Sequence, residues 1–115
     1  MPSWLTNLFG QAKPGPAWIE QAELRRAIGR EDRPMVIDVR GPDEFDGPLG
    51  HIDGAVNIPL PDLAEHTTGL ADAGSAIVVV CLTDKRSAAA AVQLAEAGIR
   101  GVTVLRGGMK AWRGE

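Results

Sequence analysis

The most reactive side chain in this sequence is its single cysteine, Cys81. It follows the apolar, β-branched run 76–80 and opens the loop 82–86, after which an alanine-rich segment starts at Ser87. A strand, a short loop and a helix in this order place the sulfur near the first N–H groups of the helix. These groups and the cations of the loop, Lys85 and Arg86, stabilise negative charge. The pattern therefore favours a thiolate, the nucleophilic form of cysteine.

Spacing alone leaves two interpretations of Cys81 open. It is either a reactive thiol in an anion-binding loop or a buried cysteine that behaves as a small hydrophobic side chain. If it is reactive, the residues expected to bind the substrate are Leu82, Thr83, Asp84, Lys85, Arg86 and Ser87. One cysteine cannot form an internal disulfide, and the two distant histidines do not have the spacing of a zinc site. No metal or cofactor is predicted.

Hydrophobic patterning predicts strands that alternate with helices. Strands are expected at 35–39, 55–58, 76–80 and 101–105, and helical segments at 20–29, 62–66, 87–97 and 109–113. The run 76–80 is apolar throughout, which is typical of a strand buried on both faces of a parallel sheet. The sequence therefore predicts an α/β domain in which a central parallel sheet is flanked by helices on both faces.

Other polar and aromatic residues near the predicted strand ends have structural interpretations. Asp38 and Arg40 end the strand 35–39 and are expected to organise neighbouring loops, with Arg40 also a candidate for substrate contact. His51 is interpreted as a hydrogen-bonding residue of a loop rather than as a general base. Gly107 and Gly108 are expected to supply turn geometry or close packing, and Trp112 to lie in the core.

Length and composition limit the classes of function. The chain has 115 residues, 44% hydrophobic residues and a net charge of −3, as expected for one soluble domain. It has no basic stripe of the kind that binds nucleic acid, and its longest apolar run is far too short to cross a membrane. No secretory signal is recognisable, so a cytoplasmic location is expected.

The first 16 residues are predicted to be separate from the domain at 17–115. Ser3 can cap a short amphipathic helix that carries Trp4, Leu5, Leu8 and Phe9, and Gly10 and the run Lys13-Pro14-Gly15-Pro16 end it. A membrane-surface role would require a basic face, which this segment lacks. We expect it to pack on its own domain or on a partner subunit.

Three sequence blocks together resemble the rhodanese family, from Ile19 to Trp112. They are Val36-Ile37-Asp38-Val39-Arg40 with Glu44-Phe45, then Gly50-His51-Ile52-Asp53-Gly54-Ala55-Val56-Asn57-Ile58-Pro59, and last Cys81 to Ser87 with Val104 to Trp112. The resemblance implies a rhodanese-like three-layer α/β fold. It also implies that Cys81 accepts sulfur as a persulfide and that the loop 82–86 holds it.

The resemblance further implies a sulfurtransferase that takes sulfur from a sulfane donor such as thiosulfate and passes it to a thiol, cyanide or a protein acceptor. Two positions depart from the family pattern. Asp84 stands where many members have glycine, and Glu44 where some thiosulfate-preferring members have a second arginine, so weaker binding of a dianionic donor is expected. The absence of a second cysteine requires the sulfur to leave to another molecule.

Two alternative functions stay open. A non-enzymatic interaction or redox-sensing module would use the same fold without sulfur transfer. A phosphatase is less consistent, because related phosphatases have five residues between cysteine and arginine, whereas four separate Cys81 from Arg86. A smaller loop suits one sulfur atom better than a tetrahedral phosphate.

Overall fold

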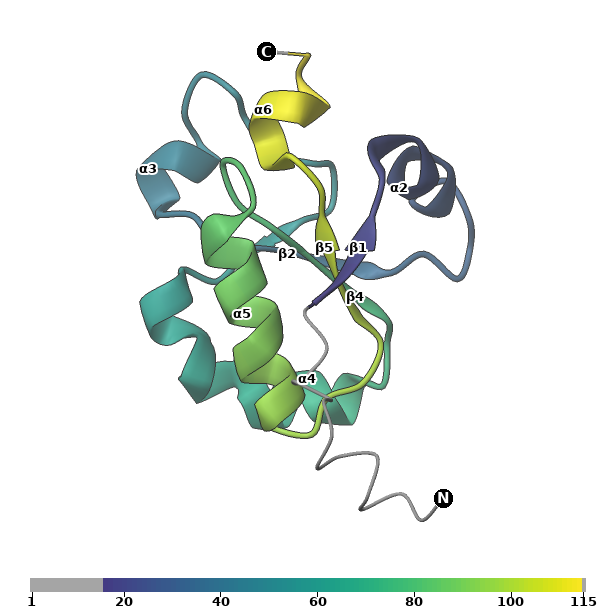
Figure 1. Cartoon of the computed structure of the whole chain (residues 1–115), viewed down its shortest axis with the longest axis vertical. Coiled ribbons are helices and arrows are strands. Elements are labelled where there is room, and N and C mark those ends of the chain that lie inside the picture. Colours follow the sequence, from purple (N-terminus) through teal and green to yellow (C-terminus); the bar gives the residue numbers. More distant parts are fainter. Residues whose placement is uncertain (1–15, 115) are drawn as a thin grey trace, which may run out of the picture.

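Five parallel strands form the centre of the molecule, in the order β1-β5-β4-β2-β3 (Figure 1). This computed structural model describes residues 16–114, so the helix expected near the N-terminus lies outside the described residues. The strands are β1 (Ala17–Ile19), β2 (Met35–Asp38), β3 (Val56–Asn57), β4 (Ile77–Val80) and β5 (Val102–Leu105).

Strand β4 is central because all four of its side chains are apolar and buried. It pairs with β2 on one side and with β5 on the other. The register aligns Asp38 at the end of β2 with Val80 of β4 and with Asn57 of β3. The polar residues at the carboxyl ends of these strands therefore lie next to one another, at the same end of the sheet as Cys81.

Helices cover both faces of the sheet (Figure 1). They are α2 (Gln21–Ala27), α3 (Pro42–Phe45), the 3-10 helix η1 (Leu60–His66), α4 (Thr67–Ala73), α5 (Lys85–Glu96) and α6 (Gly108–Trp112). Alternate residues of β4 point to opposite faces: Ile77 and Val79 pack with Leu63, Leu70 and Leu94, and Val78 and Val80 pack with Leu24, Met109 and Trp112. The predicted three-layer α/β fold is confirmed.

Three elements were not expected from the sequence, namely β1, α3 and α4. Strand β1 has three residues and is placed by its pairing with β5, a contact that a local pattern does not contain. The Gly-Pro turn after β2 continues into α3, with Pro42 in the first helical turn and the Glu44 carboxylate accepting a hydrogen bond from the Gly41 N–H. Helix α4 buries only Leu70, so it has little amphipathic signal.

The predicted start of the helix after the cysteine loop was wrong by two residues. Helix α5 begins at Lys85 rather than at Ser87, because Asp84 already occupies the N-cap position. Its carbonyl accepts the hydrogen bond from the Ala88 N–H at 2.9 Å. Lys85 and Arg86 therefore belong to the first turn of α5, and the loop proper is confined to residues 82–84.

Candidate active site

Cys81 lies immediately after the last residue of β4, at the edge where open α/β sheets bind ligands. The residue is 1% exposed. Its Sγ accepts a hydrogen bond from the Ser87 N–H at 3.3 Å and lies 3.2 Å from the Ser87 hydroxyl. Both partners belong to the first turn of α5, a twelve-residue helix whose N-terminal end favours negative charge. The sulfur is therefore held where a thiolate or a persulfide anion would be stabilised.

The predicted loop residues that follow Cys81 differ in exposure. Leu82, Asp84 and Arg86 are half-buried, Thr83 and Lys85 are exposed, and Ser87 is buried. Ser87, the last residue of the predicted set, contacts the Cys81 sulfur directly.

Helix α6 fixes the backbone of the cysteine loop. The Met109 N–H donates to the Cys81 carbonyl at 2.9 Å, and the Lys110 N–H donates to the Leu82 carbonyl at 3.0 Å. Gly108 makes this approach possible, because a Cβ there would collide with the carbonyl oxygens of Cys81 and Thr83. Its φ of +59° also favours glycine. The prediction of close packing at this glycine is confirmed.

Asp84 contacts the turn that precedes α6. Its carboxylate accepts a hydrogen bond from the Gly107 N–H at 3.3 Å. The sequence-based expectation treated this carboxylate only as a charge that opposes anion binding. In the structure it also connects the cysteine loop to α6, so removing the side chain changes the loop anchorage as well as the charge.

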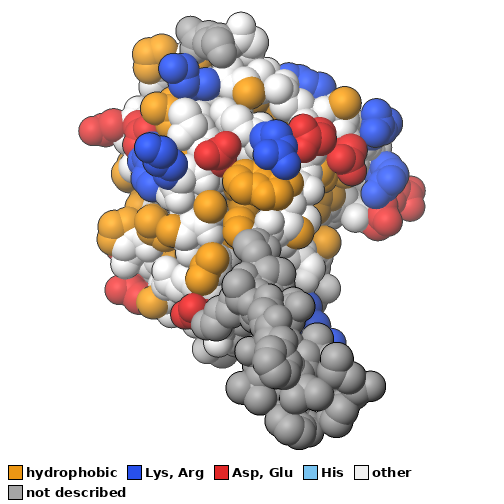
Figure 2. All heavy atoms as spheres, in the orientation of Figure 1, with side chains coloured by type: hydrophobic (Ala, Val, Ile, Leu, Met, Phe, Trp, Pro, Cys, Tyr) orange, Lys and Arg blue, Asp and Glu red, His pale blue; other side chains and the backbone are white. Residues whose placement is uncertain are grey.

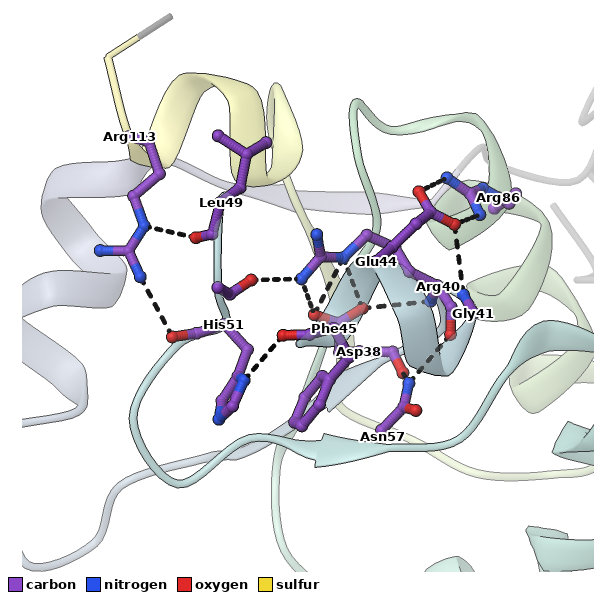
Figure 3. A network of polar contacts seen from close by, with 11 residues as sticks. Asp38, Arg40, Gly41, Glu44, Phe45, Leu49, His51, Asn57, Arg86 and Arg113 are labelled. Carbon is purple, nitrogen blue, oxygen red and sulfur yellow. Dashed lines mark hydrogen bonds and ion pairs between the residues drawn. The ribbon is translucent and has the colours of Figure 1, made fainter. Parts of the chain in front are cut away.

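Arg86, in the first turn of α5, is bound by Glu44 of α3 (Figure 3). Two hydrogen bonds, of 2.7 and 2.9 Å, join the guanidinium to the two carboxylate oxygens, and each side chain is 38% exposed. The hydrogen bond from Arg86 lowers the pKa of Glu44 from 4.5 to about 2, while desolvation acts in the opposite direction. The hydrogen bond to Glu44 raises the pKa of Arg86, and the nearby Cys81 adds to this increase.

This ion pair changes the expected electrostatics of the loop. Arg86 was expected to act as a free cation near the sulfur, but much of its charge is neutralised by Glu44. Within residues 16–114 the structure shows no ion pair for Lys85, which is exposed. Because the folded-state pKa of Glu44 is lowered, the pair's contribution to stability is present above pH 4.5 and is lost as the pH falls towards about 2.

A second ion pair joins Asp38, at the end of β2, to Arg40 (Figure 3). Both side chains are 1% exposed, and the Arg40 guanidinium donates to both Asp38 oxygens and to the Gly50 carbonyl. The Asn57 side-chain amide donates to the carbonyls of Asp38 and Arg40. Burial and these partners are consistent with the expected role of Asp38 and Arg40 in holding neighbouring loops, and a contact of Arg40 with substrate stays a prediction.

His51 lies in the loop that precedes β3 (Figure 3). Its Nδ1 donates to the Phe45 carbonyl at 3.0 Å, and the two rings are stacked with centroids 3.7 Å apart. Arg113, after α6, donates to the carbonyls of Leu49 and His51. The predicted hydrogen-bonding role of His51 is confirmed, and the same loop is joined to both α3 and the end of α6.

Sequence reasoning missed the role of Glu44 as the partner of Arg86 and that of Asn57 as a donor to two carbonyls. Neither had a local signal, because the two carbonyls that Asn57 binds are 19 and 17 positions away and the partner of Glu44 is 42 positions away. Within residues 16–114 no cluster of three or more His, Cys, Asp or Glu side chains could hold a metal ion. In the same part of the chain no helix is long and apolar enough to cross a membrane.

Comparison with known proteins agrees with this geometry. The thiosulfate sulfurtransferase GlpE of Shewanella oneidensis is 42% identical over 78 residues, which cover 68% of this chain and 74% of GlpE. The Synechocystis protein slr1261 is 37% identical over 86 residues, and the match covers 75% of this chain but only 46% of slr1261. A crystal structure of a rhodanese-related protein from Thermoplasma volcanium has a TM-score of 0.71 and 31% identity, and the match covers 84% of this chain and 89% of that one.

The family model that matches is the rhodanese-like domain, over residues 20–115. Together with the GlpE relatives, it supports a sulfurtransferase activity in general terms. The three-layer fold, the position of Cys81 after the central strand and this match lead to the same conclusion. The chain belongs to the rhodanese-like family.

Proposed function

We propose that this protein transfers sulfane sulfur through a persulfide on Cys81. The observation that carries the proposal is the setting of the Cys81 sulfur, which contacts the N–H and the hydroxyl of Ser87 at the start of α5. Hydrogen bonds to sulfur and the helix N-terminus favour the anionic form, and an anionic sulfur is required both to attack a donor and to leave in the second step.

The reaction is a double displacement. The Cys81 thiolate attacks the outer sulfur of the donor, a new S–S bond forms, and the donor's remaining group leaves with the bonding electron pair, as sulfite when the donor is thiosulfate. A nucleophilic acceptor then attacks the terminal sulfur of the persulfide, and the Cys81 thiolate is released. Because the chain has no second cysteine, the acceptor is a small thiol, cyanide or another protein.

The charge around the loop favours donors of low negative charge. Glu44 neutralises much of the charge of Arg86, and Asp84 adds a carboxylate, so of the two loop cations only Lys85 has no ion pair within residues 16–114. A thiosulfate dianion therefore gains less electrostatic stabilisation at this loop than it would beside two arginines without ion-pair partners. We infer that a thiol persulfide is a better donor than thiosulfate.

The burial of Cys81 supports the same class of donor. With 1% of the residue exposed, only a slim group can reach the sulfur, and the terminal sulfur of a persulfide is a single atom on a flexible chain. Burial also limits hydrolysis and oxidation of the bound persulfide. A phosphatase is disfavoured, because the guanidinium of Arg86 is bound to Glu44 and is not available to clamp a phosphate.

The experiment is intact mass measurement after incubation with thiosulfate and with glutathione persulfide, followed by addition of a thiol. One added sulfur atom on the wild type, removed by the thiol, is the expected result. Cys81→Ser should gain none while keeping its fold, because a hydroxyl cannot form a persulfide. Ser87→Ala should still load, but more slowly, because it keeps the N–H and loses the hydroxyl.

Two results would count against the proposal. Sulfur transfer by purified Cys81→Ser at a rate near that of the wild type would exclude the persulfide on Cys81. Failure of the folded wild type to gain sulfur from either donor would favour the interaction or redox-sensing module.

A further inference from the structure

Helix α6, whose backbone holds the cysteine loop, has only five residues. A helix of this length is not stable by itself, so its position depends on contacts with the rest of the molecule. Two of its side chains, Met109 and Trp112, are buried against α2 and the sheet. Any further contact that fixes the carboxyl end of α6 therefore also affects the loop that begins at Cys81.

Arg25 of α2 makes two contacts with Trp112, the last residue of α6. Its guanidinium donates a hydrogen bond to the Trp112 carbonyl at 2.6 Å, and its Cζ lies 3.8 Å from the centroid of the Trp112 ring. The last carbonyls of a helix have no partner within the helix, so this hydrogen bond satisfies an acceptor that the helix leaves open. The position over the indole adds a cation–π contact. One side chain therefore fixes both the helix end and its aromatic ring.

The other end of α6 is bonded to the cysteine loop through its backbone. The N–H groups of Met109 and Lys110 donate to the carbonyls of Cys81 and Leu82, at 2.9 and 3.0 Å. Trp112 is three residues beyond Met109, which is about 4.5 Å along the helix axis. Because so short a helix moves as one unit, a shift at Trp112 changes the geometry of both hydrogen bonds.

The position of the Cys81 backbone in turn decides the contact of its sulfur with Ser87. The Ser87 N–H donates to the sulfur at 3.3 Å and belongs to a different element, α5. Hydrogen bonds weaken steeply when their length or angle changes. A loop that moves with α6 therefore alters the hydrogen bond that stabilises the sulfur anion.

We propose that Arg25 is a positioning residue of the candidate active site and acts through α6. Its guanidinium fixes the carboxyl end of α6 at Trp112, and the amino end of α6 fixes the backbone of Cys81 and Leu82. The effect of Arg25 on sulfur uptake rests on the proposed function, whereas its effect on the contact between α6 and the loop does not.

The test is Arg25→Gln in the full chain, which removes the guanidinium and keeps a similar helix propensity. Hydrogen exchange of single amides, measured by NMR well below the Tm of each variant, reports the hydrogen bonds of Met109 and Lys110 directly. The exchange of these two amides should be about five- to tenfold faster in Arg25→Gln, while that of the β4 amides should change by less than about twofold.

Sulfur uptake should slow down in the same variant. Intact mass after rapid mixing with glutathione persulfide gives the rate of a single loading step. At saturating donor, Arg25→Gln should load about threefold more slowly, because the sulfur is less well aligned for attack. The donor concentration for half-maximal rate should change by less than about twofold, because Arg25 acts on the position of the sulfur and not on the donor.

Two matched controls separate the loss of charge and the loss of a hydrogen bond from the loss of position. Figure 2 shows several Lys and Arg side chains in the upper part of the view, where Figure 1 places α2 and α6. Arg26→Gln removes the neighbouring charge of α2, and Arg26 has no side-chain hydrogen bond or ion pair within residues 16–114. Arg33→Gln removes a guanidinium–carbonyl hydrogen bond of 2.8 Å, to Asp53, away from α6. Neither control should change the exchange of the α6 amides by more than about twofold.

Three results would overturn the proposal. Unchanged exchange of Met109 and Lys110 in Arg25→Gln would show that α6 is held without Arg25. An equal increase in the exchange of the β4 amides would show that Arg25 contributes only to global stability. Faster exchange of the two α6 amides with unchanged sulfur uptake would show that α6 does not position the sulfur. If the folded wild type takes up no sulfur, the proposed function fails, while the exchange rates still decide whether Arg25 fixes α6 on the loop.

Discussion

Two Asp/Glu–Arg pairs involve residues at or after the ends of strands β2 and β4, and they differ in burial. Asp38–Arg40 is almost completely enclosed, with both side chains 1% exposed, whereas each side chain of Glu44–Arg86 is 38% exposed. The enclosed pair is joined to the backbone at Gly50, and the carbonyls of both its residues are bound by Asn57. The exposed pair connects α3 to the first turn of α5.

Burial decides what each pair does. In a low dielectric an unpaired charge is costly, so Asp38 and Arg40 depend on each other and hold the loops that surround the site. Near solvent the same kind of contact contributes little to stability, but its charges still act on an approaching ligand. The buried pair is therefore structural, and the exposed pair sets the charge at the start of α5.

The largest effect is expected when the buried pair is broken. Arg40→Met leaves the Asp38 carboxylate buried without its partner and should lower the free energy of unfolding by about 3–5 kcal/mol, measured in urea. Glu44→Gln should lower it by less than about 1 kcal/mol, because its ion pair is half-exposed. An equal loss of unfolding free energy in Arg40→Met and Glu44→Gln would contradict the distinction between a buried structural pair and an exposed pair.

A double variant sharpens this prediction. Asp38→Asn combined with Arg40→Met removes both charges, so no unpaired ion is left in the interior. It should recover part of the stability that Arg40→Met alone loses. If it is less stable than Arg40→Met, the loops depend on the hydrogen bonds of Asp38 more than on neutralisation of charge.

The contrast also explains what could be predicted from the sequence. The run 76–80, the cysteine after it and the helix with Ser87 form one continuous segment, so local patterning was sufficient to place them. Alternating strands and helices predicted the α/β class, and the resemblance supplied its rhodanese-like form. The Glu44–Arg86 pair and the contact between Asp84 and Gly107 join residues 42 and 23 positions apart, and no local pattern contains such contacts. Strand β1 was missed for the same reason, since pairing with β5 defines it.

The next effect concerns donor preference. Glu44→Gln keeps an oxygen that can accept a hydrogen bond from Arg86 but removes the negative charge. The kcat/KM for thiosulfate should rise about five- to tenfold, which corresponds to about 1 kcal/mol, and the gain should shrink at high salt. The kcat/KM for a thiol persulfide should change by less than about twofold.

Asp43→Asn is the matched control for the loss of the negative charge in Glu44→Gln. Asp43 precedes Glu44 in α3, is exposed and has no ion pair within the described residues 16–114. Its removal changes the net charge of the protein by the same amount without releasing Arg86. If Asp43→Asn raises the kcat/KM for thiosulfate as much as Glu44→Gln does, the overall charge of the protein, rather than the Glu44–Arg86 ion pair, controls donor preference.

The smallest effect is expected at Asp84, where charge and anchorage act together. Its carboxylate accepts the Gly107 N–H at 3.3 Å, a long hydrogen bond worth about 0.5–1 kcal/mol. Asp84→Ala should therefore lower the kcat/KM for a thiol persulfide about two- to fivefold, because the loop loses its contact with the turn before α6. Asp84→Asn keeps an acceptor oxygen and removes one negative charge, so the kcat/KM for a thiol persulfide should stay within about twofold, and that for thiosulfate should rise by less than in Glu44→Gln. If alanine and asparagine behave alike, the hydrogen bond to Gly107 does not position the loop. If asparagine instead reproduces the thiosulfate gain of Glu44→Gln, Asp84 acts mainly through its charge, and both carboxylates set donor preference together.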